Sequence, residues 1–125
     1  MTERLTKPLL DVRNLSISFS QNGRETVAVN RCSFSIEAGK TLALVGESGS
    51  GKSTLGRSLL NLISPSSGSI IFDGEELVGK DQRAMKPWRR RMQMIFQDPY
   101  ASLNPRMTIY DALAEPLLLH GIASK

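Results

Sequence analysis

The 125-residue sequence predicts an α/β fold from three features of its hydrophobic pattern. Two segments in the first third of the chain alternate apolar and polar residues, as antiparallel strands do. Residues 41–45 (TLALV) are apolar almost throughout, which is typical of a strand covered on both faces in a parallel sheet. A glycine-rich loop and an amphipathic segment follow directly, so a strand–loop–helix unit is expected.

The alternating segments predict an antiparallel hairpin. The first covers residues 10–19, and its alternation slips by one residue near Asn14, which indicates a β-bulge. Residues 21–24 (QNGR) have turn chemistry, and residues 27–36 alternate again with a second slip. The two strands are therefore expected to pair through this turn.

The middle of the chain predicts a helix followed by two short apolar strands. The helix is expected over residues 53–63, because the sequence SPSSG ends it. Residues 69–72 form a predicted strand closed by an Asp-Gly turn. The basic segment after the turn is expected to be partly helical, interrupted or started at Pro87, and residues 92–96 are expected to form another strand.

The last segment predicts a capped helix. Thr108 has the chemistry of an N-cap, with Asp111 three residues later as an imperfect capping box. The helix is expected to run towards His120, with a kink at Pro116. His120 is interpreted as a helix-end surface residue.

Charge and cysteine usage narrow the class of protein. The net charge is +4, and six cations lie between positions 80 and 91. A solvated helical face is favoured over a nucleic-acid or lipid-headgroup footprint, and neither an aromatic-interleaved platform nor zinc-finger spacing supports the nucleic-acid option. Trp88 is interpreted as a partly buried anchor rather than a base-stacking platform. The single cysteine, Cys32, excludes an internal disulfide and is interpreted as a small apolar filler.

Membrane segments are not expected. No apolar run approaches the roughly 18 residues of a spanning helix, and the first residues lack the apolar stretch of a secretory signal. Any membrane association is therefore expected to run through a partner protein.

The loop GESGSGKST at residues 46–54 matches the P-loop pattern GxxxxGK[ST] in full. Its glycines let the main chain approach a phosphate closely, and successive N–H groups form an anion nest at the positive end of a helix dipole. Lys52 would reach the β- and γ-phosphates, and the Ser53 hydroxyl would be a ligand for Mg²⁺. A glycine- and serine-rich linker has no reason to lie between an apolar strand and a helix. The predicted nucleoside triphosphate site is Gly46, Glu47, Ser48, Gly49, Ser50, Gly51, Lys52, Ser53 and Thr54.

Three longer stretches resemble one family: GESGSGKSTLGRSLL, SPSSGSIIFDGEEL and MIFQDPYASLNPRMTIYDALAEPL. They are similar to the ATP-binding subunits of ABC transporters, most of all the F-type subunits of the oligopeptide, dipeptide and nickel importer group. The resemblance implies a P-loop NTPase fold of ABC type. It implies an antiparallel β region at about residues 9–40, a P-loop core at 41–97, and the Q-loop with the start of a helical subdomain at 98–125.

The resemblance also implies roles for residues outside the P-loop. Phe19 falls where the family stacks an aromatic ring on adenine, whereas its alternation with Ile17 alone predicts a core residue. Gln97 is the expected Q-loop glutamine, which would touch Mg²⁺ or the attacking water and link the site to the membrane subunit. Residues 98–107, with Tyr100 and Leu103, are equally compatible with a groove for a membrane-subunit coupling helix and with local packing.

Two family motifs are absent from the sequence. No LSGGQ occurs, and no apolar strand ends in Asp-Glu to supply a Walker B pair. We therefore expect the 125 residues to be the N-terminal portion of a longer, incomplete domain that binds ATP with Mg²⁺. Whether the chain itself is an enzyme is left open.

The resemblance implies an ATPase subunit that energises the import of peptides or similar small solutes in the full assembly. The partners would be a second ATP-binding subunit in a homo- or heterodimer, integral membrane permease subunits and, indirectly, an extracytoplasmic solute-binding protein. The chain would be peripheral, at the cytoplasmic face of the bacterial inner membrane. The alternatives are a truncated, non-hydrolysing nucleotide-binding fragment and an ABC-type ATPase of a non-transport complex, in phosphonate breakdown or DNA repair.

Overall fold

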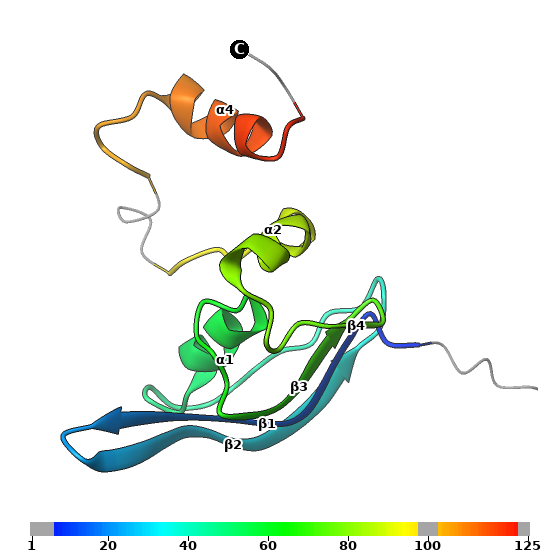
Figure 1. The fold of residues 1–125 in the computed structure, drawn as a ribbon, viewed down its shortest axis with the longest axis vertical. Coiled ribbons are helices and arrows are strands. Elements are labelled where there is room, and N and C mark those ends of the chain that lie inside the picture. Colours follow the sequence, from blue (N-terminus) through cyan, green and yellow to red (C-terminus); the bar gives the residue numbers. More distant parts are fainter. Residues whose placement is uncertain (1–6, 98–102, 123–125) are drawn as a thin grey trace, which may run out of the picture. The chain divides into compact units, whose positions relative to one another are not determined.

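The computed structural model describes residues 7–97 and 103–122. The contacts divide the chain between Asp81 and Gln82 into two compact units, and each is described by itself. The first unit carries the sheet, the P-loop and helix α1. The second carries helices α2 and α4 (Figure 1).

The first unit is built on a four-stranded antiparallel sheet in the order β2-β1-β3-β4 (Figure 1). Its strands are β1 (Leu10–Gln21), β2 (Arg24–Ile36), β3 (Ser67–Phe72) and β4 (Glu75–Glu76). The β1–β2 turn places Asn22 and Gly23 at φ 53° and 76°, the backbone of a tight hairpin turn with two left-handed residues. The predicted hairpin and the predicted strand at residues 69–72 are both confirmed.

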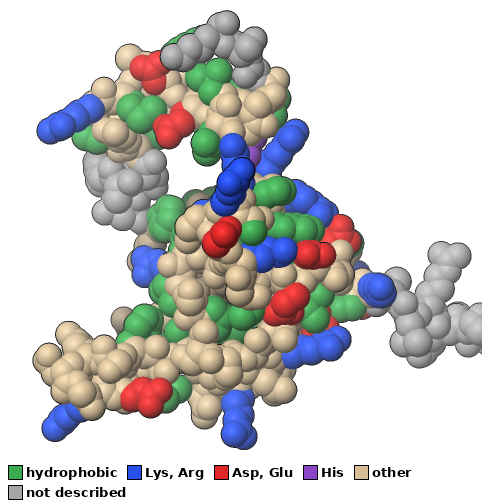
Figure 2. Space-filling model, in the orientation of Figure 1, with side chains coloured by type: hydrophobic (Ala, Val, Ile, Leu, Met, Phe, Trp, Pro, Cys, Tyr) green, Lys and Arg blue, Asp and Glu red, His purple; other side chains and the backbone are tan. Residues whose placement is uncertain are grey.

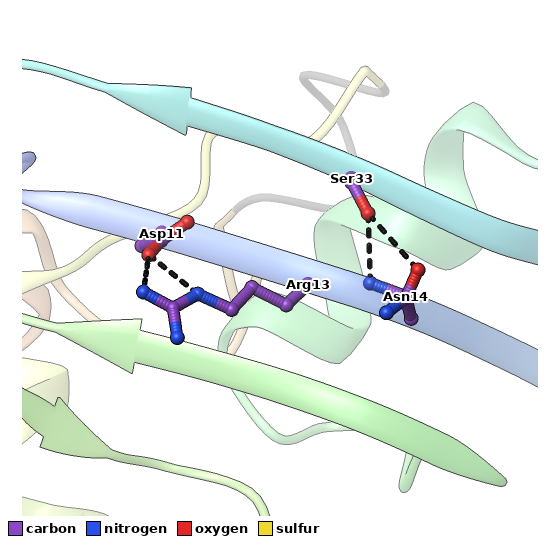
Figure 3. Close-up of polar contacts among 4 residues, drawn as sticks. All are labelled: Asp11, Arg13, Asn14 and Ser33. Carbon is purple, nitrogen blue, oxygen red and sulfur yellow. Dashed lines mark hydrogen bonds and ion pairs between the residues drawn. The ribbon is translucent and has the colours of Figure 1, made fainter.

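Bulges interrupt the pairing of β1 with β2 at three places. The first is at Asn14, whose φ is 48°, and it confirms the slip expected there. The hydroxyl of Ser33 accepts a hydrogen bond from the Asn14 N–H at 2.8 Å, so a side chain replaces a missing ladder bond (Figure 3). On the same strand the Arg13 guanidinium pairs with Asp11, with 2.7 Å between Nη2 and Oδ2 (Figure 3).

The apolar residues of the sheet and α1 (Lys52–Leu59) form the core of this unit, with the helix lying over one face of the sheet (Figure 1). Leu55 of α1 and Val29 of β2 are both buried. The helix ends a turn before the expected residue 63, because Asn61 takes a left-handed φ of 57°. The Leu62 N–H then donates to the Arg57 carbonyl at 2.9 Å, which closes a Schellman motif.

The two mostly apolar segments are not strands, which corrects the prediction for residues 41–45 and 92–96. Val45 is 88% exposed and Ile95 is 97% exposed. A strand requires a neighbour to pair its N–H and C=O groups, and no described strand pairs with either segment. Apolar composition alone therefore did not make either segment a buried strand.

The second unit contains α2 (Gln82–Arg91) and α4 (Ile109–Leu119). Helix α2 continues through Pro87. The expectation that Pro87 starts or interrupts the helix is therefore wrong. Thr108 is the N-cap of α4, and its Oγ1 accepts a hydrogen bond from the Asp111 N–H at 3.1 Å, as predicted. His120 is the C-cap of α4, as expected, and the helix continues through Pro116. Within the described ranges, no helix is long and apolar enough to cross a membrane.

Candidate nucleotide-binding site

The predicted P-loop forms a tight turn that leads into α1. The Ser50 N–H donates to the Glu47 carbonyl at 3.1 Å, which bends the loop back on itself. The bend leaves no room for a side chain at Gly46, where a Cβ would lie 2.6 Å from the Ser50 hydroxyl oxygen. The sequence motif therefore encodes a curled backbone, as a phosphate cradle requires.

Gly51 joins the loop to the helix and is its N-cap, with φ 95° and ψ 7°. Its carbonyl accepts the first helical hydrogen bond, from the Leu55 N–H at 2.9 Å. The remaining N–H groups of the first turn have no partner within an α-helix, so they are available at the positive end of the helix. The loop and the helix N-terminus thus offer hydrogen-bond donors to an anion at one place.

Lys52 folds back over the loop from the first position of α1. Its Nζ donates to the carbonyl oxygens of Gly46 and Glu47, the latter at 2.9 Å, and lies 3.4 Å from the Ser50 hydroxyl. An ammonium group has three donors, so these contacts engage all of them. Lys52, the only positive side chain of residues 46–54, is therefore held against the loop, where the motif predicted a phosphate.

A bulge of β2 packs against the P-loop at Gly51. In the register, Ile17 pairs with Val29 and Ser18 with Val27, which leaves Ala28 as the extra residue. A Cβ on Gly51 would lie 2.4 Å from the Ala28 carbonyl oxygen, so the loop packs directly on this bulge. Bulges of this kind are common next to active sites.

The contact between Gly51 and Ala28 borders a small cavity of about 200 Å³. The cavity is lined by Ala28, Val29, Asn30, Cys32, Leu44, Val45, Ser50, Gly51, Lys52 and Leu55. Sequence reasoning did not identify Ala28. The sequence carried no signal for it, because the second predicted slip lies between Val29 and Cys32, where the register also shifts, and not at Ala28.

Phe19 lies on β1 and its side chain is 43% exposed. The alternation of Leu15, Ile17 and Phe19 places all three on one face of the strand, and the first two are buried. The pattern-only expectation of a core residue is therefore wrong at Phe19, whose ring emerges from the edge of the core. Stacking on adenine stays a prediction, and an exposed ring is compatible with it.

Two further predicted site residues, Ser53 and Gln97, are exposed. Ser53 lies in the first turn of α1 with an exposed side chain. Gln97 is exposed and belongs to the second unit, so its distance from the P-loop stays untested. The expected groove at residues 98–107 lies partly outside the described residues, Tyr100 included, while Leu103 is described and exposed. No group of three or more His, Cys, Asp or Glu side chains in the described ranges is placed to hold a metal ion.

The basic cluster lies largely on α2, where Figure 2 shows Lys and Arg side chains gathered. Arg83, Lys86 and Arg90 are exposed, as a solvated helical face requires. Trp88 is half buried, as expected, and the Arg91 guanidinium lies over its ring at 5.6 Å from the centroid. This cation–π contact occupies one face of the indole.

Comparison with known proteins places these features in a family. The model of the family described as "ABC transporter" matches residues 29–124. A putative peptide import ATP-binding protein of Brucella ovis is 49% identical over 118 residues, covering 94% of this chain and 37% of that protein. The oligopeptide transport ATP-binding protein OppF of Bacillus subtilis is 48% identical over 120 residues, covering 95% of this chain and 39% of that protein.

A third relative, the glutathione import ATP-binding protein GsiA of Shigella dysenteriae, is 49% identical over 123 residues, covering 93% of this chain and 20% of that protein. Among solved structures, the dimeric structure of MJ0796, a bacterial ABC transporter cassette, matches with a TM-score of 0.78 at 22% identity. That match covers 93% of this chain and 50% of the other. The chain thus spans well under half the length of these curated relatives.

Proposed function

Because this chain belongs to the ABC transporter family, we propose that it binds ATP and, within a full assembly, energises the import of peptides or similar small solutes. The observation that carries the proposal is the P-loop, in which a curled backbone, a helix N-terminus and the Lys52 ammonium converge. The relatives named for peptide, oligopeptide and glutathione import support the substrate class.

Phosphate binding would exchange the present contacts of Lys52 for stronger ones. Of its three contacts, the one to the Ser50 hydroxyl is the longest at 3.4 Å, so this donor is the easiest to redirect. A phosphate oxygen carries negative charge, so a bond from the ammonium to phosphate joins opposite charges, whereas the present bond to Ser50 joins the ammonium to a neutral hydroxyl. Lys52 therefore gains by turning a donor toward a bound phosphate while its other donors keep the loop closed.

The loop fits ATP with Mg²⁺ on chemical grounds. Residues 46–54 would hold the phosphates through main-chain N–H groups, and the exposed Ser53 hydroxyl is an oxygen ligand of the kind that Mg²⁺ prefers. Gln97 carries an amide oxygen for the same ion and an amide donor for water. The ion, when bound, neutralises charge on the phosphates.

The adenine end of the nucleotide is assigned to Phe19. Its ring is exposed on the face of β1 that also carries Ile17, and Ile17 pairs with Val29 beside the bulge that supports Gly51. One hairpin thus carries both the aromatic ring and the seat of the phosphate loop. This arrangement supports a nucleotide held by its base and its phosphates at one time.

The proposed partners are a second ATP-binding subunit, in a homo- or heterodimer, and integral membrane permease subunits. A solute-binding protein outside the membrane would deliver the substrate to the permease. The dimeric description of MJ0796 supports the first partner, and the import names of the relatives support the others. The chain would act as a peripheral subunit at the cytoplasmic face of a bacterial inner membrane.

Co-purification from bacterial membranes tests the proposal. The expected result is a complex with a polytopic membrane protein, and ATP-driven uptake of a labelled peptide that is lost with Lys52→Ala. Salt-sensitive DNA binding without any membrane partner would contradict it in favour of a non-transport ATPase. Assembly that supports uptake equally well with Lys52→Ala would contradict the role of the P-loop.

A further inference from the structure

The β1 strand is held differently on its two sides as it approaches Phe19. On one side β2 pairs with it to the end of the hairpin, where Gln21 faces Arg24. On the other side the regular pairing with β3 ends earlier, at Ser16 and Ser67. The strand would therefore be supported from one side only before it reaches the aromatic ring.

Ser66 extends this second support beyond the end of β3. Its N–H donates to the Ser16 carbonyl at 2.8 Å, and its hydroxyl oxygen accepts a hydrogen bond from the Ser18 N–H at 3.0 Å. The side chain of Ser66 thus takes the place of the next ladder partner. The support now reaches the residue directly before Phe19.

The Ser18 hydroxyl carries the connection across to β2. It donates to the Glu25 carboxylate at 2.8 Å, so in its 2.8 Å contact with the Ser66 hydroxyl it is the acceptor and Ser66 the donor. Every hydrogen in this chain of contacts has an acceptor. Ser66, Ser18 and Glu25, here called the serine brace, therefore tie three segments together at one residue.

The brace lies behind the aromatic ring rather than against it. Consecutive strand residues point to opposite faces, so the Ser18 side chain points away from the face that carries Phe19. The brace consequently fixes the backbone from which the ring projects and leaves the ring exposed. Resting on the proposed role of Phe19, we propose that the serine brace is a positioning element that aligns Phe19 for the purine base.

A comparison of two ligands tests the brace in the intact chain. ATP engages both the ring and the P-loop, whereas inorganic tripolyphosphate engages the P-loop alone. The affinity for ATP divided by the affinity for tripolyphosphate, here called the ratio, therefore reports on the base contact. Loss of the Ser66 hydroxyl in Ser66→Ala is expected to weaken ATP binding roughly 3- to 10-fold, the size of one or two hydrogen bonds. Tripolyphosphate binding is expected to stay unchanged, and Ser66→Thr, which keeps a hydroxyl, is expected to restore the ratio.

Ser33 provides a matched control. Its hydroxyl accepts a backbone N–H bond from Asn14 of the same strand at 2.8 Å, but five positions from Phe19 (Figure 3). Ser33→Ala removes the same chemistry and is expected to leave the ratio unchanged. An equal change of the ratio in Ser33→Ala, or an equal loss of both ligands in Ser66→Ala, would overturn the positioning role.

Phe19→Ala separates this inference from the proposed function. If Phe19→Ala lowers the ratio and Ser66→Ala does not, the ring binds adenine and the serine brace does not position it. If Phe19→Ala also leaves the ratio unchanged while both ligands bind, the adenine contact itself is wrong and the inference falls with it. A lowered ratio in both variants, restored by Ser66→Thr, is the expected result.

Discussion

The contact between Gly51 and the Ala28 bulge makes a quantitative prediction for Gly51→Ala. The new methyl group would take a backbone with φ 95°, which costs an L-residue about 1–2 kcal/mol. It would also lie 2.4 Å from the Ala28 carbonyl oxygen and 3.4 Å from a Val29 methyl carbon. Overpacking of this kind costs about 1–3 kcal/mol. Together with the backbone cost, it is expected to lower the unfolding free energy by about 2–5 kcal/mol.

Gly49→Ala is the matched control, because it adds the same methyl group in the same loop. Gly49 also has a positive φ of 83°, but a Cβ there meets nothing within 4 Å. Its expected cost is therefore the backbone term alone, about 1–2 kcal/mol. The difference between the two variants isolates the contact with the bulge.

Urea unfolding followed by far-ultraviolet circular dichroism measures both variants. We expect Gly51→Ala to unfold at a lower urea concentration than Gly49→Ala, with a similar slope. Indistinguishable midpoints would refute the reasoning, because they would mean that the loop does not rest on Ala28.

Three further predictions concern the ends of α1 and α4 and the Q-loop residue. Asn61→Ala is expected to lower the unfolding free energy by about 1–3 kcal/mol in the same urea assay. Alanine is strained at the left-handed φ of this position, and it lacks the amide that makes the 2.5 Å bond to the Lys80 carbonyl. Asn61→Gly removes only the bond and should recover part of the loss. Thr108→Ala is expected to lower stability by about 1 kcal/mol by removing the acceptor for the Asp111 N–H, and Thr108→Ser to retain it; equal stabilities would contradict the cap. Gln97→Ala should spare ATP binding but lower transport-coupled hydrolysis in the assembled importer, and unchanged coupled hydrolysis would remove the proposed role of Gln97.

The features that the sequence predicted well are those decided by a few neighbouring residues. Asn22 and Gly23 adopt the left-handed angles that their types favour, and the turn fixes the hairpin. The slip at Asn14 and the cap at Thr108 were likewise visible in local chemistry. The curl of the P-loop backbone is equally local, since it follows from glycine spacing and from Lys52 reaching back to its own loop, while phosphate binding there stays a prediction.

The features that were predicted wrongly depend on partners far along the chain. The segments at residues 41–45 and 92–96 have strand composition, yet strand pairing is a property of two segments and no described strand flanks them. The end of α1 was misplaced because Asn61 takes a left-handed φ of 57°, and its side chain is held there by a bond to the Lys80 carbonyl, 19 residues away. The role of Ala28 was missed because only the folded chain brings a bulge of β2 against Gly51.

Equilibrium binding of Mg·ATP to the chain and to its Lys52→Ala variant tests the central claim most directly. The account predicts saturable binding that unlabelled ATP competes away and that Lys52→Ala weakens severely, while both proteins keep the same circular dichroism spectrum. Equal affinities in two equally folded proteins would contradict the claim that this loop holds the triphosphate.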